Sequence, residues 1–440
     1  MFGSRYLPSD RTRWTDGFDS SPVWPSEPDL AVSKDVVAAA LHVQVQDLSV
    51  EFLAEGTHHK VYEISSALWS TFYIFRIAIP IFPFYKMESE MATLTFLRQN
   101  TQIPVAKPIA WDSSAKGPLG YEWASVEKLP GVELRHLWNQ APWDKKLDII
   151  DVIAAFLAQL WDPRNRFSKI GSLYLKEPHH GRDPHHPASS PTKATGNERF
   201  LVGAAVDGDL FAGRRRYIPE DRGPYDSCHH WLGSLIQAEE RFLRSAGYLL
   251  AYGKARNVNQ VEEEWEDMLD EIGFEEENFE EKQKSTLRTC RDYRFMLHRI
   301  FPQPNLSQKD EPRFYLHHCD LREANIILDP ETFAITGVID WEQSCILPDW
   351  YAIDYPLFIN DDEPINNTEP PIPKTYDVDS NEYSETEAAE RTRWEAKALR
   401  RRFDCNIECL LKRNDWRPTS SPQNYLKSRF IQGIANLSES

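Results

Sequence analysis

One segment of the chain, residues 317–342, constrains the possible folds more than any other. An apolar run begins at Asn325, the turn-forming sequence Asp-Pro-Glu-Thr follows at 329–332, and a second apolar run at 335–339 leads to Asp340. Two apolar runs joined by turn residues are typical of a β-hairpin. Because the start of the first strand of a hairpin lies beside the end of the second, we expect Asn325 and Asp340 to be neighbours in space.

The side chains at this end of the predicted hairpin indicate a metal site. Carboxylate and amide oxygens suit a hard cation such as Mg²⁺, bound together with substrate phosphates. Asp320 lies in the loop just before the hairpin, five residues ahead of Asn325. Transfer of a phosphoryl group from a nucleotide requires this arrangement, in which one acid orients a hydroxyl group and the other holds the metal.

The same segment resembles a known family. The pattern HxDxxxxN at residues 318–325, followed by Ile-Asp-Trp-Glu at 339–342, is similar to the aminoglycoside phosphotransferase and choline kinase branch of the protein-kinase-like fold, in its fungal phosphotransferase-enzyme-family form. The resemblance implies a role for each matching residue: Asp320 as the catalytic base or hydroxyl-orienting group, Asn325 and Asp340 as metal ligands, and His318 as a brace of the loop. A general base is the alternative role for His318, since an unperturbed imidazole has a pKa of about 6.5.

The resemblance also implies an α+β fold of two lobes, a small N-terminal lobe with an antiparallel sheet and a larger, mainly helical C-terminal lobe. Residues 48–79 are rich in aromatic and β-branched residues, which favours a small sheet. Residues 85–99 have apolar residues at helical spacing. Residues 147–160 are apolar nearly all round, as in a helix buried at the centre of a larger lobe.

From these patterns we predict the domain organisation. The expected parts are an N-terminal arm at 1–44, a nucleotide-binding lobe at 45–130, and a helical lobe at 131–440 with the catalytic loop at 318–325, the metal-binding motif at 340–342 and surface insertions near 176–199 and 261–285. The first insertion has two pairs of adjacent histidines, but their spacing matches no standard metal motif. The second contains twelve acidic residues between 262 and 281, which is either an electrostatic lure for a cationic substrate or an exposed connector.

The turn at Gly56, Thr57 and His58 resembles the strand-turn-strand that covers nucleotide phosphates in this family. It has a single glycine, so phosphate contacts would come from a few backbone N–H groups at residues 57–59 rather than from a multi-glycine nest. An ordinary hairpin turn is the alternative interpretation.

Arg76 departs from the family pattern, which usually has a Lys on the third strand to hold the nucleotide phosphates. An arginine can contact a phosphate or a carboxylate with two parallel hydrogen bonds. On an otherwise apolar strand it needs a partner, and we expect Glu90, with Glu88 as the fallback. The alternative for both glutamates is a solvated helix face. Residues 122–131 resemble the hinge that binds a purine through its backbone.

Composition excludes several partners. Sixty-eight acidic against fifty basic side chains give a net charge of −18, which opposes binding to nucleic acid or to an anionic membrane. The longest apolar stretch, 68–85, is interrupted by polar residues and prolines, so no membrane helix is predicted. The first 25 residues mix arginines with aspartates and lack an apolar core, which argues against a secretory leader and more weakly against a mitochondrial one. We therefore expect a cytoplasmic location.

The expected function is Mg²⁺-dependent transfer of the γ-phosphate of ATP or GTP to a hydroxyl group of a small molecule, with a cationic acceptor as one option. Protein-kinase activity is disfavoured, because Asp340 is followed by Trp-Glu and no Ala-Pro-Glu occurs in the chain. The alternative is a nucleotide-binding pseudokinase or scaffold with little or no catalysis, which Arg76 and the single-glycine turn favour.

Overall fold

The structure, a computed structural model, describes most of the chain: residues 13–14, 22–176, 199–206, 221–244, 276–302, 313–360, 385–412, 426–427, 429–431 and 433–434. The interior of the predicted insertion at 176–199 lies outside these residues. So does residue range 261–275 of the second insertion, with most of its acidic side chains. Within the described residues, no helix is both long and apolar enough to cross a membrane.

A five-stranded antiparallel sheet forms the N-terminal part, with the strand order β3-β4-β5-β7-β6. Its strands are β3 (Leu48–Glu55), β4 (His59–Ser66), β5 (Tyr73–Ala78), β6 (Pro108–Asp112) and β7 (Glu122–Glu127). Side chains alternate across β5, so Phe75 and Ile77 belong to the apolar cluster on one face while Ala78 belongs to the main core on the other. Arg76 therefore lies on the face that is directed toward the main core.

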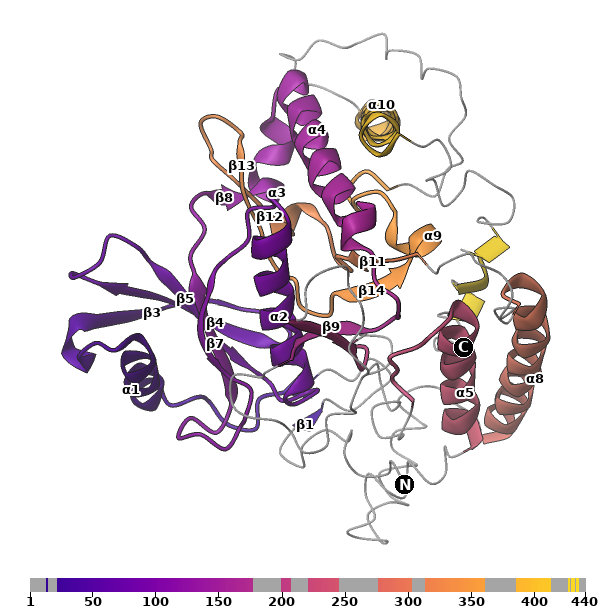
Figure 1. The fold of residues 1–440 in the computed structure, drawn as a ribbon, viewed down its shortest axis with the longest axis horizontal. Helices are drawn as coiled ribbons and strands as arrows, with labels where there is room; N and C mark the ends of the chain where they lie inside the picture. The colour runs from indigo at the N-terminus through magenta and orange to yellow at the C-terminus, as the bar shows by residue number, and fades with distance from the viewer. Residues whose placement is uncertain are drawn as a thin grey trace, which may run out of the picture.

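Two helices cover the two faces of this sheet. Helix α2 (Tyr85–Asn100) lies between the sheet and the rest of the molecule (Figure 1). Helix α1 (Leu30–Leu41) packs on the other face, where Val37 and Ala38 join its apolar cluster. The Asp29 carboxylate caps α1 by accepting hydrogen bonds from two backbone N–H groups of the first turn, at 2.8 and 3.2 Å. The predicted arm at 1–44 thus contains a packed helix that the sequence analysis did not predict.

The remainder of the chain is mainly helical. Its helices are α3 (Leu134–Leu137), α4 (Trp143–Leu160), α5 (Cys228–Arg244), α8 (Glu276–Ile300), α9 (Asp349–Ala352) and α10 (Glu385–Leu411). Helix α10 lies beside α4, and α5 beside α8 (Figure 1). Helix α4 buries one face, which includes Ile149, Ile150 and Ile153, whereas Val152 on the other face is exposed, so the helix is not buried all round as the apolar run at 147–160 predicts. One apolar core runs from α2 into α4.

Short strands connect these helices and position the loops. They are β1 (Arg13–Trp14), β2 (Pro22–Val23), β8 (Val132–Glu133), β9 (Ser172–Leu175), β10 (Phe200–Gly203), β11 (Phe314–His317), β12 (Ile326–Leu328), β13 (Ile335–Val338) and β14 (Cys345–Pro348). β12 pairs with both β13 and β8, and β11 pairs with β14. The antiparallel sheet followed by a helical part confirms the α+β fold, whereas the division of the chain near residue 130 stays a prediction.

Candidate active site

The β12–β13 hairpin brings the predicted metal ligands together. Ile326 pairs with Val338, and the backbone N–H of Ile339 donates a hydrogen bond to the carbonyl of Asn325 at 2.9 Å. Asn325 and Asp340 are therefore neighbours, as the hairpin argument predicts. Asp340 has a φ of 60°, a left-handed conformation that aspartate tolerates better than most residues. The chain turns there immediately after β13.

Asn325 also fixes the loop that carries Asp320. Its buried Nδ2 donates hydrogen bonds to the Asp320 backbone carbonyl at 2.7 Å and to Asp320 Oδ2 at 3.1 Å. The amide nitrogen is thereby used and the amide oxygen remains as an acceptor. The Asp320 carboxylate is 39% exposed and also pairs with Arg322 Nε at 2.9 Å. Asp320 is thus held in place but accessible to another molecule.

His318 connects this loop to the end of the hairpin. Its Nδ1 accepts a hydrogen bond from the backbone N–H of Asp320 at 3.2 Å, so the ring proton lies on Nε2, which donates to the carbonyl of Ile339 at 3.0 Å. Its ring packs 4.5 Å from that of Trp341, and burial lowers the pKa of His318 to about 4. Both ring nitrogens are engaged, which favours bracing over general-base catalysis.

The surroundings of Asp340 suit a divalent cation. Asp340 is exposed to solvent, but partial desolvation by the groups around it raises its pKa, and the nearby Glu342 and Asp320 act in the same direction, whereas Arg76 and Lys86 oppose them. No hydrogen bond or ion pair within the described part of the chain engages its carboxylate. In the same part, no three His, Cys, Asp or Glu side chains form a cluster able to hold a metal ion. A cation at Asn325 and Asp340 would therefore need further ligands from the oxygens of a bound phosphate, as is common for Mg²⁺.

Arg76 of β5 forms an ion pair with Glu90 of α2, the partner predicted from the sequence. The two side chains are only 14% and 4% exposed, so Glu90 does not lie on a solvated helix face. Although burial opposes the charged form, Glu90 raises the pKa of Arg76 above its usual value. The fallback, Glu88, instead accepts hydrogen bonds from Trp111 Nε1 at 3.1 Å and from Ser113 Oγ at 2.7 Å.

The predicted phosphate-covering turn connects β3 to β4. It is closed by a hydrogen bond from the Gly56 N–H to the His59 carbonyl at 2.9 Å. A Cβ atom added at Gly56 would meet nothing within 4 Å, so the fold itself does not require glycine there. Gly56 and Thr57 are exposed, and His58 is directed toward the metal-binding motif.

The turn, helix α2 and the metal-binding motif meet at one carboxylate, that of Glu342. Lys86 Nζ lies 2.9 Å from Glu342 Oε1, His59 Nδ1 lies 3.1 Å from Oε2, and His58 Nδ1 lies 3.5 Å from Oε1. The Glu342 side chain is 6% exposed. Burial alone would raise the pKa of Glu342, but His59 and Lys86 hold it well below its usual value.

Sequence analysis named the backbone of His59 among the phosphate contacts but missed its side chain, and it missed Lys86, as members of the site. Lys86 precedes Glu90 by four residues, a spacing that places both side chains on one face of a helix. Since Glu90 is predicted to contact Arg76, this spacing is sufficient to predict that Lys86 lies near the same region. His59 follows His58 directly, and no local pattern distinguishes it from a strand residue.

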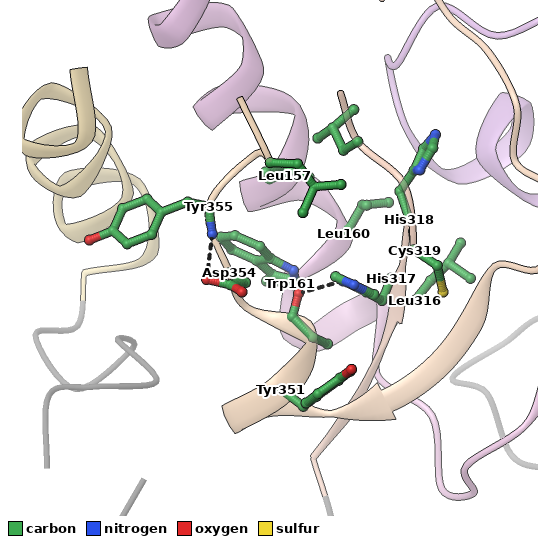
Figure 2. A pocket seen from close by; sticks show the side chains of 13 residues that line it. Leu157, Leu160, Trp161, Leu316, His317, His318, Cys319, Tyr351, Asp354 and Tyr355 are labelled. Carbon is green, nitrogen blue, oxygen red and sulfur yellow. Dashed lines mark hydrogen bonds between the residues drawn. The ribbon is translucent and has the colours of Figure 1, made fainter. Parts of the chain in front are cut away.

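A cavity of about 170 Å³ lies behind the catalytic loop, lined by residues of α4, β11 and α9 (Figure 2). His317 donates a hydrogen bond from Nδ1 to the carbonyl of Ala352 at 3.0 Å, and burial lowers its pKa to about 4. Asp354 accepts from the backbone N–H of Tyr355 at 2.8 Å, and burial raises its pKa to about 6. These groups lie beside the loop, next to His318 and Cys319 in the lining of the cavity.

An antiparallel sheet joined to a helical part, with an HxDxxxxN loop held against a hairpin that ends in aspartate, defines the class of kinase-like phosphotransferases. The model of the Phosphotransferase enzyme family matches residues 49–351, well over half of the chain. The chain belongs to this family. The predicted resemblance and the predicted protein-kinase-like fold are thereby confirmed.

Curated relatives come from fungi. A subtelomeric hrmA-associated cluster protein of Aspergillus fumigatus is 27% identical over 347 residues, which cover 74% of this chain and 64% of that protein. Altered inheritance of mitochondria protein 9 of Clavispora lusitaniae is 23% identical over 410 residues, which cover 88% and 62%. The chain thus spans a little under two thirds of the length of these relatives.

Solved structures of small-molecule kinases are also similar. The streptomycin-ATP-APH(2")-IIa ternary complex has a TM-score of 0.40 at 8% identity, covering 94% of this chain and 99% of that one. An ethanolamine kinase of Plasmodium vivax has a TM-score of 0.36 at 13% identity, covering 92% and 85%.

The predicted cytoplasmic location is contradicted by these comparisons. The relatives from Clavispora lusitaniae, Kluyveromyces lactis and Eremothecium gossypii are named as mitochondrial proteins. The prediction rests on the mixed charges and the missing apolar core of the first 25 residues, which argue only weakly against a mitochondrial leader.

Proposed function

We propose that this chain is a Mg²⁺-dependent phosphotransferase that moves the γ-phosphate of ATP or GTP to a hydroxyl group of a small molecule. Membership of the phosphotransferase family supports the class of reaction. The observation that carries the proposal is the gathering of Asp320, Asn325 and Asp340 at one end of the β12–β13 hairpin. Phosphoryl transfer depends on positioning and charge, and these three side chains can supply both.

Asp320 is the proposed catalytic base or hydroxyl-orienting group. Its carboxylate is accessible, so an acceptor hydroxyl can reach it, and Asn325 and Arg322 fix its direction. As the new P–O bond forms, the bond from the γ-phosphorus to the bridging oxygen breaks, the nucleoside diphosphate leaves, and the hydroxyl proton passes to this carboxylate. His318 holds the loop in place from its buried position and takes no part in the proton transfer.

Asn325 and Asp340 are the proposed ligands of Mg²⁺, which would neutralise charge on the transferred phosphate. Arg76 and the backbone N–H groups of Thr57 and His58, in the turn that Gly56 opens, are the proposed phosphate contacts, with Glu90 holding Arg76 in position. A positively charged acceptor fits the net charge of −18.

A nucleotide-binding protein with little or no catalysis is the second candidate. The observations that favour it are the arginine at position 76, where the family usually has a lysine, and the turn with the single glycine, Gly56. Such a protein would bind a nucleotide without transferring phosphate.

The experiment measures release of nucleoside diphosphate by the purified protein with Mg²⁺ and ATP or GTP. Acceptors are supplied as pools of amino alcohols, sugars, aminoglycosides and nucleosides, and Asp320→Ala is the control. Acceptor-stimulated release that the variant loses would support the phosphotransferase. Nucleotide binding with no release from any pool would favour the second candidate, and the absence of both would contradict the two together.

A further inference from the structure

We propose that Lys86 is a phosphate-binding residue of this site, held by Glu342 until a nucleotide enters. The inference rests on the proposed function and adds a residue to it. Lys86 would work beside Arg76, as the second fixed positive charge near the metal-binding motif.

The position of Lys86 is unfavourable unless an anion is present. Its side chain is 4% exposed and lies in the first turn of α2. Burial disfavours a charged ammonium group, and the positive end of the helix dipole disfavours it further. An apolar side chain of similar size would fill this space at lower cost. A lysine there indicates that an anion is bound at this point.

The anion that faces Lys86 is Glu342, which lies two residues after Asp340. It is the only acid among the described residues within ion-pair distance of Lys86, at 2.9 Å. The ammonium of Lys86 also lies 3.5 Å from His59 Nε2. Because an ammonium group only donates, His59 Nε2 accepts, and the proton of the neutral ring lies on Nδ1, which faces Glu342.

These contacts make Glu342 a stand-in for a phosphate. The carboxylate lies where the turn, helix α2 and the metal-binding motif meet, which is where the proposed nucleotide phosphates pass between the turn and Asp340. Lys86 and His59 present to it an ammonium and a ring N–H, the donors that a phosphate oxygen would also accept. A bound phosphate can therefore replace Glu342 as the ion-pair partner of Lys86.

Charge balance supports the same assignment. Two cations, Arg76 and Lys86, act on the Asp340 carboxylate. The charge of Arg76 is neutralised by Glu90, its partner in a buried ion pair. Lys86 is matched by Glu342, which lies beside the metal-binding residue. Of the two cations, Lys86 is thus the one whose ion-pair partner can change when nucleotide and metal bind.

The experiment compares Lys86→Met with Lys146→Met, a matched control. Lys146 is also a buried lysine with one carboxylate partner, Glu395 at 2.6 Å, but it lies between α4 and α10. Affinities for Mg-ATP, Mg-ADP and adenosine are measured by calorimetry on samples shown to be folded by their thermal transitions. Lys86→Met should weaken both phosphate-bearing ligands by about 10- to 100-fold, the value of a charge-assisted hydrogen bond, and leave adenosine unchanged. Lys146→Met should change none of them.

A second variant tests the role of Glu342. In EDTA, where no metal contributes, Glu342→Gln should bind ADP several-fold more tightly than the natural protein, and the gain should vanish when Lys86→Met is added. Weaker binding in EDTA, or a gain that survives in the double variant, would overturn the stand-in role.

The outcomes separate this inference from the proposed function. If the natural protein binds ATP and Lys86→Met binds all three ligands equally well, Lys86 is not a phosphate-binding residue and the proposed function stands. If Lys86→Met weakens adenosine as much as ATP, its role is structural and the inference is also wrong. If the natural protein binds no nucleotide, both proposals fail.

Discussion

Asn325 donates a hydrogen bond from Nδ2 to Oδ2 of Asp320 at 3.1 Å, while its backbone carbonyl accepts from the residue before Asp340. One residue therefore sets the direction of the proposed base through its side chain and the position of the proposed metal ligand through its backbone. The two groups can be tested separately, because they have different proposed functions.

For Asp320→Ala we expect turnover to fall by at least about 10²-fold, the low end of what a positioned acid or base contributes. Nucleotide affinity should change little, because Asp320 is not a proposed phosphate contact. Steady-state kinetics and calorimetry on the same samples measure the two quantities. Glu331→Ala, at an exposed acidic residue in the turn between β12 and β13, serves as the control. A variant that loses affinity and keeps its turnover would contradict the assignment.

Asp340→Asn should weaken binding of Mg-nucleotide and leave binding of metal-free nucleotide nearly unchanged. The substitution keeps the shape of the side chain and removes the charge that would hold the cation. Titrating ADP with and without Mg²⁺ measures the difference between the two affinities. Equal affinities in the natural protein would show that Mg²⁺ is not held at Asp340.

Arg76→Met should cost about 3 to 5 kcal/mol in the free energy of unfolding, because it leaves Glu90 buried without its partner. The double variant Arg76→Met with Glu90→Met should recover much of that loss. Both variants should bind nucleotide more weakly. Chemical denaturation gives the stabilities, and calorimetry gives the affinities. Full affinity in a folded double variant would show that Arg76 is not a phosphate contact.

Glu122, at the start of β7, is the basis of a prediction about pH. Burial raises the pKa of Glu122 to about 8, although the backbone N–H of Phe84 donates to its carboxyl group. A folded-state pKa above the unfolded value of 4.5 contributes stability below pH 4.5 that is lost as the pH rises toward 8.

Glu122→Gln keeps the acceptor for Phe84 and removes the titration, so it should unfold at a higher temperature than the natural protein at pH 8. The gain should be at most about 4 kcal/mol and should shrink toward pH 5. Glu51→Gln, at an exposed position of β3, is the control. A gain that does not change between pH 5 and pH 8 would contradict the cause assigned here.

Much of the fold and of the geometry of the candidate site could be predicted from the sequence because the information is local. The hairpin that joins Asn325 to Asp340 spans a few residues, with alternating apolar runs and turn residues. The contact between Arg76 and Glu90 was predictable because an arginine on an apolar strand needs a carboxylate and α2 offers one on the facing side.

Other features depend on contacts between distant segments. Glu342 meets Lys86 and His59 only after the helical part has packed against the sheet, so no local pattern pairs them. Helix α1 was missed because prolines dominate the sequence around it, although Asp29 is a capping residue and Val37 marks an apolar face. The single glycine at Gly56 fits a phosphate-covering turn and an ordinary hairpin turn equally well.

The most direct test of the proposed function is transfer of label from γ-labelled ATP or GTP, with Mg²⁺, to the pooled acceptors. Unlike diphosphate release, this measurement distinguishes transfer from simple hydrolysis. We predict labelled phosphate on an organic acceptor with the natural protein and none with Asp320→Ala. Label that appears only as inorganic phosphate, or equally with both proteins, would contradict the phosphotransferase.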